Sequence, residues 1–585
     1  MKPRIISAFL FFLLLAIGIL LSLHKPLWND EIFTQIYSVE RQSLPNMMLG
    51  KIPEKGNAPL FYLIQKGVCQ LSGYKFPFTM DGEWEVADPR SQIILRFSSN
   101  IFMSLAVVLI FYYFLRFYSL GAGIYSLFFS LSSYMVWAYW VEARPYSLWF
   151  LLTTIQALSF LHIIRQKKME EKHWLKLSLI HWVLAFAAVA SLMQILIVSF
   201  LIWIFKKERK WQRYLVLAIL PTVICIFYNT QSPQFKFWYT KSWMDLVYAA
   251  FSLPRMFMIG LLGCFVIYKN HERLENKSFL TLTTLMVLSG LALLVFFKIA
   301  NTGGPQGFEI SSRYFIYLTP LSIIAATIFV AQLFQTFSKN KFALAAIVVI
   351  VALVLKFDYD QVRGNLWAGR WMPSLTTNPT QVQAAAYATN LDHLTPQYPQ
   401  MVDFIEGKRT LDQETLTHYK KYYAKIAEYS PTHADAYGLW GYFSYRLNDY
   451  DQAIAAYQKA IELNPHFLWF YYNLGLLHFK KGDYKTTVEL LNTALKTRTD
   501  FSLMFIDSSN QIYKPIIGER VNSSNFSLEK QFRQGKCNSL VILAFIYKTL
   551  GEDGVSIKLL EKAEQLSQVD GFPVPKISDI DLESY

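Results

Sequence analysis

Two adjacent carboxylates, Asp30 and Glu31, follow directly after the first apolar stretch of the chain. A carboxylate in such a position can act as a general base, which takes the proton from a hydroxyl group while its oxygen attacks an electrophilic carbon. Transfer of a sugar to a hydroxyl acceptor requires a base of this kind. The structural alternative is a helix cap, in which Asn29 or Asp30 caps a short helix over residues 31–37.

Cationic side chains at later positions could meet a phosphate group. Arg144 follows one apolar stretch, and Arg313 precedes another. A guanidinium group binds phosphate oxygens through paired hydrogen bonds, so these residues could neutralise a departing lipid phosphate. Lys241 and Lys298 are weaker candidates for the same role. The structural alternative for Arg144 is an ion pair with Glu142 or with lipid headgroups.

Long apolar runs must position these residues. Hydrophobic residues make up 53% of the 585-residue chain and charged residues only 17%, which is too apolar for one soluble domain. We expect about 11 membrane spans, because each run is long enough to cross much of a bilayer. The expected spans are 5–23, 92–115, 121–140, 147–164, 175–190, 191–205, 214–228, 248–268, 279–297, 314–337 and 342–355.

The run 5–23 and the stretch 175–205 each allow two readings. No small-x-small cleavage site follows residues 5–23, so we interpret this run as a retained helix and not as a cleaved signal peptide. The stretch 175–205 suits two short helices and a tight turn better than a single helix.

The distribution of Lys and Arg predicts the orientation. Basic residues are concentrated in alternate loops, such as 165–176 and 206–213, as is typical of cytoplasmic loops. We therefore expect an integral protein of the plasma or inner membrane with a cytoplasmic N-terminus. With an odd number of spans, the tail lies outside the cytoplasm. The net charge of +14 has the same origin, so we expect the lipid bilayer and no nucleic acid as a partner.

The first loop outside the cytoplasm, residues 24–91, is about 70 residues long and rich in charge, proline and glycine. Loops of this length without a function are uncommon. Its apolar patches at residues 32–39 and 60–71 predict short helices that lie on the membrane surface.

Near the C-terminus the chain repeats itself. Residues 434–465 and 468–499 align at an offset of 34 residues, with Gly441 matched by Gly475. The pattern resembles the tetratricopeptide repeat, whose paired helices pack through small residues, with Pro465 ending the second helix. Such arrays present a concave face that binds peptides or proteins. The alternative is a structural spacer or a dimerisation surface.

A weaker copy of the repeat begins near Cys537, which leaves room for one degenerate repeat before it. The expected fold is thus all-α, with a polytopic helical domain and a soluble α-solenoid. The expected boundaries are 1–356 for the transmembrane domain, 357–415 for a linker, 416–570 for the repeat domain and 571–585 for a C-terminal tail.

Several short motifs, taken in order, resemble those of membrane glycosyltransferases of the GT-C fold, in particular the protein O-mannosyltransferase-like and aminoarabinose-transferase-like superfamily. The motifs are Asp30-Glu31, Asn57-Ala58-Pro59-Leu60-Phe61-Tyr62, Leu95-Arg96-Phe97-Ser98, Glu142-Ala143-Arg144-Pro145-Tyr146 and Arg313-Tyr314. The resemblance covers residues 1–355. Two departures stand out: Ala58 replaces the first proline of a Pro-Pro pair, and Met193-Gln194 replaces a His-Tyr pair. The tail is similar to that of membrane mannosyltransferases bearing tetratricopeptide repeats.

The resemblance implies an inverting glycosyltransferase that uses a polyprenyl-phosphate sugar and acts on a protein, glycan or lipid outside the cytoplasm. It implies that Asp30 is the base, supported by Glu31. It also implies that Arg144, Arg313 and Lys241 hold the donor phosphate. The other implied substrate-binding residues are Asn57, Pro59, Tyr62, Arg96, Glu142, Tyr146 and Tyr314.

Two other classes of protein fit these features less well. A transporter, flippase or polymerase of lipid-linked glycans needs polar residues within its spans, and the spans here are almost free of charge. A membrane-anchored scaffold that recruits partners needs only one span. No cofactor is implied by the motifs. Asp30, Glu31 and Glu142 could ligate a divalent metal, although no ligand spacing in the sequence requires one.

Overall fold

The structure is a computed structural model of the chain. It describes residues 3–24, 31, 33–54, 58–74, 90–166, 169–206, 210–231, 263, 279–285, 287–291, 315–362, 410–429, 434–465, 467–497 and 528–580. The chain divides into two compact units, and each is described by itself. Within the described ranges the regular elements are helices and no β-strand is formed, so the expected all-α class is confirmed there.

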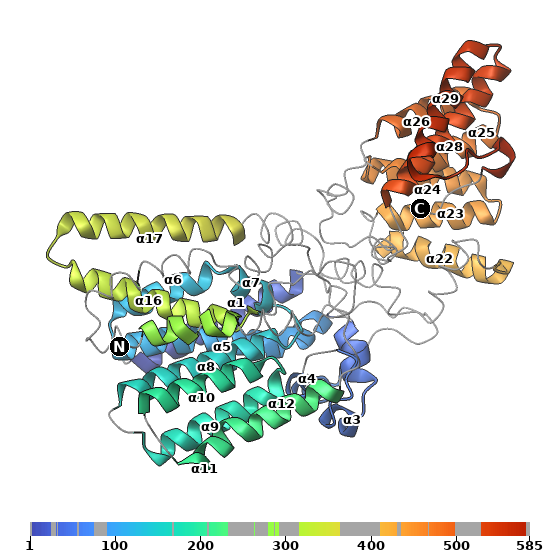
Figure 1. The fold of residues 1–585 in the computed structure, drawn as a ribbon. Helices are drawn as coiled ribbons and strands as arrows, with labels where there is room; N and C mark the ends of the chain where they lie inside the picture. Colours follow the sequence, from blue (N-terminus) through green and yellow to red (C-terminus); the bar gives the residue numbers. More distant parts are fainter. Residues whose placement is uncertain are drawn as a thin grey trace. The chain divides into compact units, whose positions relative to one another are not determined.

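The first unit is a helical bundle (Figure 1). Its helices are α1 (Pro3–His24), η1 (Thr34–Glu40), α3 (Leu44–Met48), α4 (Leu60–Leu71), α5 (Arg90–Phe117), α6 (Leu120–Leu131), α7 (Tyr134–Trp140), α8 (Tyr146–Arg165), α9 (Glu171–Ala187), α10 (Ser191–Lys206), α11 (Trp211–Tyr214), η2 (Leu215–Ile219), α12 (Leu220–Gln231), α16 (Leu318–Thr336) and α17 (Lys341–Val362).

Helix α5 lies at the centre of this bundle and packs against α4, α6, α7 and α8. Its buried face includes Met103, Ile110 and Phe114, which have no exposed surface. Gly123 of α6 lets this helix approach closely, because a Cβ atom there would lie 3.2 Å from the ring of Phe111. Helix α8 then joins α5 to α9 and α16, so the core continues across the unit.

Five helices are long and apolar enough to cross a membrane by length and composition. They are Pro3–Leu23, Gln92–Phe117, Tyr146–Arg165, Trp211–Gln231 and Leu318–Thr336, with shorter apolar helices at Leu120–Leu131, Ser191–Lys206, Phe279–Leu291 and Lys341–Leu353. The expected number of about 11 spans is not confirmed by this set. The expected span 248–268 lies almost wholly outside the described residues.

The expected span 121–140 differs from the structure. It is divided into α6 and α7 by Ser132 and Ser133. The hydroxyl of Ser132 donates to the carbonyl of Phe129 at 3.4 Å, and the indole N–H of Trp137 donates to the carbonyl of Leu131. Side chains that bond to the backbone in this way compete with helical hydrogen bonds and end the helix. The stretch 175–205, in contrast, forms two helices, α9 and α10, as predicted.

The first loop contains helices at both predicted places, η1 and α4. The ammonium group of Lys66 on α4 donates to the carbonyls of Val39 and Gln42 at 2.8 and 2.7 Å, and so holds the end of η1. The hydroxyl of Tyr228 on α12 donates to the carbonyl of Met48 on α3 at 3.1 Å. The Lys66 bonds hold two helices of the loop together, and the Tyr228 bond fixes the loop to helix α12 of the bundle.

The second unit is built from paired helices. Its elements are α22 (Gln413–Tyr429), α23 (Ala434–Arg446), α24 (Tyr450–Leu463), α25 (Leu468–Lys480), α26 (Tyr484–Lys496), α28 (Leu528–Thr549), α29 (Asp553–Asp570) and η6 (Ile577–Asp579). The pairs are α23 with α24, α25 with α26, and α28 with α29.

Matching residues perform matching roles in the first two pairs. Asp449 and Asp483 cap α24 and α26 by accepting from backbone N–H groups three residues later, at 3.3 and 3.2 Å. Gly441 and Gly475 lie against the following helix, where a Cβ atom would come within 3.0 Å of Tyr457 and 2.9 Å of Leu491, respectively. The third pair packs directly on α25 and α26. The degenerate repeat that we allowed for before Cys537 falls mostly on residues 498–527, outside the described part.

Candidate functional site

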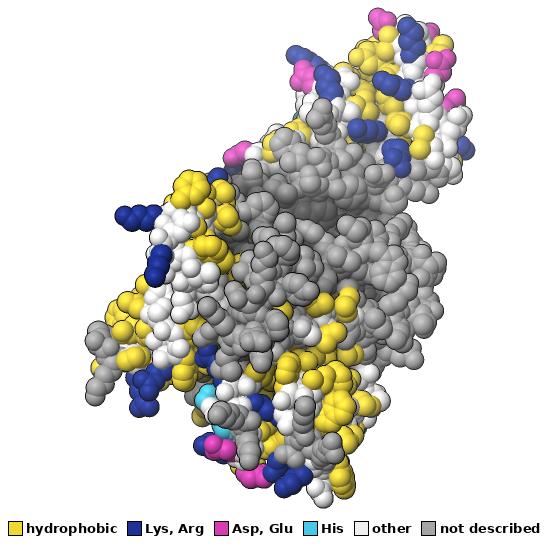
Figure 2. Space-filling view, turned by 60° about the vertical axis from the view of Figure 1, so that its left-hand side comes forward, with side chains coloured by type: hydrophobic (Ala, Val, Ile, Leu, Met, Phe, Trp, Pro, Cys, Tyr) yellow, Lys and Arg dark blue, Asp and Glu magenta, His cyan; other side chains and the backbone are white. Residues whose placement is uncertain are grey.

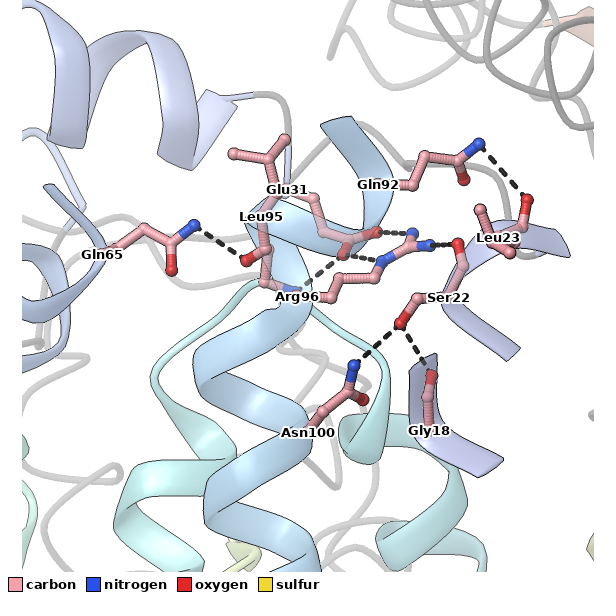
Figure 3. Close-up of polar contacts among 10 residues, drawn as sticks. Gly18, Ser22, Leu23, Glu31, Gln65, Gln92, Leu95, Arg96 and Asn100 are labelled. Atoms are coloured by element: carbon pink, nitrogen blue, oxygen red, sulfur yellow. Dashed lines mark hydrogen bonds and ion pairs between the residues drawn. The ribbon is translucent and has the colours of Figure 1, made fainter. Parts of the chain in front are cut away.

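A fully buried ion pair joins Glu31, at the start of the first loop, to Arg96 on α5 (Figure 3). Arg96 donates from Nε to Oε1 at 2.8 Å and from Nη2 to Oε2 at 2.7 Å. This bidentate geometry is the strongest arrangement of a guanidinium and a carboxylate. The Nη1 of Arg96 also donates to the carbonyl of Ser22 at the end of α1, at 3.1 Å.

Glu31 makes a third contact, with the turn that precedes α8. Its Oε1 accepts from the backbone N–H of Ala143 at 2.7 Å. Buried charges are tolerated only where their hydrogen bonds are satisfied, and these contacts provide several of them. Glu31 therefore holds together the end of α1, the start of α5 and the turn before α8.

Polar contacts extend this junction along α1 and α5 (Figure 3). Asn100 donates to the hydroxyl of Ser22 at 3.0 Å, and that hydroxyl donates to the carbonyl of Gly18 at 2.9 Å. The amide of Gln65 on α4 donates to the carbonyl of Leu95 at 2.8 Å. The junction thus fixes α4 of the first loop, as well as α1, on the start of α5.

A second buried cluster surrounds the carboxylate of Glu54. Its Oε2 lies 3.1 Å from Nη1 of Arg144 and accepts from the hydroxyl of Tyr62 at 3.0 Å. Its Oε1 accepts from the hydroxyls of Thr34, through a short contact, and of Ser38 at 3.4 Å. Two hydroxyls, a phenol and a guanidinium thus point at one carboxylate.

Arg144 is held on several sides. Its Nη1 donates to the hydroxyl of Thr34 at 3.1 Å, and its Nη2 donates to the hydroxyl of Tyr146 at 3.4 Å. The guanidinium carbon lies 5.6 Å from the centroid of the Tyr146 ring. The backbone N–H of Arg144 donates to the carbonyl of Glu142 at 2.8 Å, which forms the tight turn before α8.

Local structure explains why these side chains converge. Thr34 and Ser38 lie on η1, a π-helical segment, which is a rare form that is frequent at functional sites. Pro59 is buried at the start of α4, where it can begin a helix without needing a backbone donor, and Tyr62 follows one turn later. The loop before Pro59 supplies Glu54.

The hydroxyl of Tyr62 remains a donor. Burial raises the pKa of Tyr62 well above its ordinary value, and the neighbouring carboxylate of Glu54 acts in the same direction. Burial likewise raises the pKa of the Cys69 thiol on the same helix to about 11. Both groups are therefore neutral at physiological pH.

The structure brings some of the predicted site residues together. Glu31 and Arg96 share one cluster, while Arg144, Tyr62 and Tyr146 share the other. The two clusters meet at the turn 142–146, because Glu31 contacts Ala143 and Thr34 contacts Arg144. Asp30, Asn57, Lys241, Arg313 and Tyr314 lie outside the described residues.

The side chains of Arg96 and Glu31 have no exposed surface and are placed to position the loop. Their expected contact with a substrate stays a prediction. Three residues of the second cluster were missed from the sequence: Glu54, Thr34 and Ser38. The only indication was a lone acidic residue three positions before Asn57, in an otherwise polar stretch.

Within the described ranges, no group of three or more His, Cys, Asp or Glu side chains is placed to hold a metal ion.

Comparisons with known proteins concern the repeats. Residues 441–497 match the family described as TPR repeat, which confirms the tetratricopeptide pattern in this segment. The Hsp70-Hsp90 organising protein of Plasmodium falciparum is 27% identical over 94 residues, which are 16% of this chain and 16% of that protein. The chain thus covers about a sixth of that relative. The family match places tetratricopeptide repeats in the tail, and arrays of such repeats present a surface that binds proteins.

Proposed function

We propose that the protein is an integral membrane glycosyltransferase that transfers a sugar from a polyprenyl-phosphate donor to an acceptor outside the cytoplasm. The acceptor hydroxyl oxygen attacks the anomeric carbon while the bond from that carbon to the phosphate oxygen breaks. Asp30 takes the hydroxyl proton, and the polyprenyl phosphate leaves. Attack from the face opposite the phosphate inverts the anomeric configuration.

The observation that carries this proposal is the contact of Glu31 with Ala143, at 2.7 Å. It holds the chain immediately after Asp30 against the turn that bears Arg144. A base for the acceptor and a cation for the departing phosphate are the two groups that the reaction needs. The sequence separates them by more than a hundred residues, and the fold brings their neighbours together.

A membrane body suits a donor with a long isoprenoid chain. Large apolar side chains are exposed on α1 and α17, among them Phe9, Phe12, Phe342 and Leu353. Figure 2 shows hydrophobic side chains over much of the described surface of this unit. Extended apolar surfaces of this kind are rare in proteins that face water, and lipid is the partner we propose for them.

The positions of the basic residues support a cytoplasmic N-terminus, with the site at the end of α5 and α8 that faces away from the cytoplasm. Arg116 and Arg165 lie in the last turns of α5 and α8, whereas the site lies at the starts of these helices. The guanidinium of Arg165 stacks over Tyr118 at 4.7 Å, so these ends are neighbours. Under the positive-inside rule this end faces the cytoplasm.

Within this proposal, Arg144 binds the donor phosphate, together with Arg313 and Lys241, and Glu142 and Tyr146 line its surroundings. Asn57, Pro59 and Tyr62 shape the acceptor side. Glu31 and Arg96 act as positioning residues that hold Asp30 in place. The repeat tail binds a protein and brings the acceptor to the membrane.

A shallow groove in the tail supports the last point. It lies along α22 and α23, has a volume of about 560 Å³, and is lined by two lysines, one glutamate and two aromatic rings: Lys421, Lys425, Glu428, Tyr437 and Trp440. Aromatic rings and lysines together suit a peptide with apolar and acidic side chains. Deletion of residues 400–585 is expected to abolish partner binding and to spare the chemical step.

The test is a transfer assay with purified full-length protein in proteoliposomes. Radiolabelled polyprenyl-phosphate mannose and related hexose or pentose donors are supplied, with proteins of the host's extracytoplasmic fraction as acceptors. We expect labelled acceptor and released polyprenyl phosphate, and loss of both in Asp30→Asn. Glu40→Gln, in the same loop, is the matched control.

Two outcomes would contradict the proposal. Full activity of a folded Asp30→Asn protein would remove Asp30 as the base. Movement of labelled lipid across the bilayer without sugar transfer would favour a flippase instead.

A further inference from the structure

The cluster around Glu54 is an anion-binding pocket that holds one of the chain's own carboxylates. Four donors surround this carboxylate: the hydroxyls of Thr34 and Ser38, the phenol of Tyr62, and the guanidinium of Arg144. The carboxylate is 5% exposed and the guanidinium 9%, so the pocket is nearly closed to water. Donors of this number and kind are what a phosphate group requires.

The charges of the pocket are balanced by the chain itself. Arg144 is paired with Glu54, and Arg96 is paired with Glu31. These two pairs carry no net charge, so a phosphate entering beside them gains little electrostatic attraction while both pairs persist. Arg144 can bind a phosphate strongly only when Glu54 releases it.

We infer that Glu54 and the donor phosphate compete for Arg144, so that the pocket of Thr34, Ser38, Tyr62 and Arg144 exchanges one anion for the other. This inference rests on the proposed function, because it takes the lipid-linked phosphate as the incoming anion. Glu54 keeps Arg144 paired in the empty site. Entry of the donor phosphate moves the Glu54 carboxylate away from the guanidinium.

Competition lowers the apparent affinity for the donor. The phosphate binds only to the fraction of molecules in which Arg144 is available, so the measured Kd exceeds the intrinsic value by the inverse of that fraction. A change that weakens the hold of Glu54 on Arg144 raises this fraction. Such a change therefore tightens phosphate binding. If Glu54 only supported the fold, its replacement would instead weaken binding.

The experiment measures binding of polyprenyl phosphate to full-length protein in nanodiscs. Glu54→Gln removes the charge and keeps the size of the side chain, and Glu54→Asp keeps the charge but shortens its reach. We expect Kd to fall by about tenfold in Glu54→Gln, which corresponds to Arg144 being available in about a tenth of the wild-type molecules. We expect an intermediate value in Glu54→Asp.

Four controls, two protein variants and two lipids, define the result. Glu40→Gln removes a carboxylate elsewhere in the loop and is expected to leave Kd unchanged. Arg144→Gln is expected to lose binding. Polyprenol, which lacks the phosphate, and phosphatidylglycerol, which supplies an ordinary lipid phosphate, show whether the effect needs the phosphate and whether it is specific to the isoprenoid.

Unchanged or weaker binding in folded Glu54→Gln and Glu54→Asp would overturn the inference. Because Glu54→Asp retains the charge, it keeps the test decisive if Glu54→Gln does not fold. The outcomes distinguish failure of the anion exchange from failure of the proposed glycosyltransferase function. Absence of polyprenyl-phosphate binding in every variant and in the wild type contradicts both. Tighter binding without sugar transfer to any acceptor supports the anion exchange and contradicts the proposed enzyme.

Discussion

The guanidinium of Arg96 and the carboxylate of Glu31 form two parallel hydrogen bonds of 2.8 and 2.7 Å, and neither side chain is exposed to solvent. This pair connects the start of α5 with the beginning of the first loop. Because Glu31 directly follows Asp30, the same ion pair stabilises the fold and positions the proposed base.

Breaking this pair is expected to destabilise the first unit strongly. Glu31→Gln or Arg96→Met leaves one buried charge without its partner, and such a loss costs about 3–5 kcal/mol. Thermal unfolding of the protein in detergent measures the change. The matched control is Glu171→Gln, which removes the carboxylate paired with Arg213; this carboxylate is 78% exposed, and we expect a loss of about 0–1 kcal/mol. Equal effects of the two changes would contradict the assigned burial.

Replacement of Arg144 by lysine is expected to reduce sugar transfer by about 10²–10³-fold, the usual effect of losing one donor to a developing negative charge. Lysine keeps the charge but cannot form the paired bonds of a guanidinium. The rate is measured under single-turnover conditions with bound donor. Arg41→Lys, an exposed change in the same loop whose guanidinium lies 4.8 Å from the Tyr37 ring, should transfer at the normal rate. Normal transfer by Arg144→Lys would show that the guanidinium is not needed.

The thiol of Cys69 is expected to react slowly. Burial raises its pKa from the ordinary 9.0 to about 11. At about pH 8 the thiolate fraction is then about a hundredfold smaller than in the unfolded chain, so alkylation by iodoacetamide should slow by about that factor. Mass spectrometry of Cys69-containing peptides in native and denatured protein gives the ratio.

The same raised pKa has a consequence for stability. The folded state holds the thiol proton more tightly than the unfolded state, so this contribution is complete below pH 9.0 and is lost as the pH rises toward about 11. Cys69→Ser should remove that part of the alkaline loss. An identical pH profile for wild type and Cys69→Ser would contradict the assignment.

Gly475→Ala is expected to destabilise the repeat unit by about 1–3 kcal/mol, because the new Cβ atom would overpack the core. That atom would lie 2.9 Å from the side chain of Leu491. Gly554→Ala is the control, since nothing lies within 4 Å of its Cβ position in helix α29. Hydrogen exchange of α25 and α26 in the full-length protein measures the effect. Faster exchange in the Gly554→Ala protein than in the Gly475→Ala protein would reverse the expected order.

Several parts of the structure followed from the sequence because they depend on local patterns. The 34-residue period specifies helix pairs in which a small residue of one helix admits a large side chain of the next, as Gly441 does for Tyr457 and Gly475 for Leu491. Apolar patches in the first loop specified η1 and α4. The break at Ser132 and Ser133 was missed, because two serines lower the average hydrophobicity of an apolar run only slightly while their side chains bond to the backbone.

The candidate site was only partly predictable. Glu31 and Arg144 were identified by residue type and by their place at the ends of apolar runs, and Arg96 and Tyr62 by the resemblance to membrane glycosyltransferases. None of the four was identified by its partner. The structural alternative for Arg144 was an ion pair with Glu142 or with lipid headgroups, and the structure gives it Glu54 as a partner at 3.1 Å. Glu54 was overlooked, since a single acidic residue in a polar loop resembles any solvated side chain.

The sequence by itself determined that the chain has apolar helices, a long first loop and a tetratricopeptide tail, because helix period and repeat spacing are encoded by neighbouring residues. Only the tertiary structure decided that Glu31 pairs with Arg96 and that Glu54 pairs with Arg144. Any carboxylate can satisfy any guanidinium, so the choice depends on which helix ends meet. That meeting is fixed by packing around α5, and it places the two ion pairs on either side of the turn before α8.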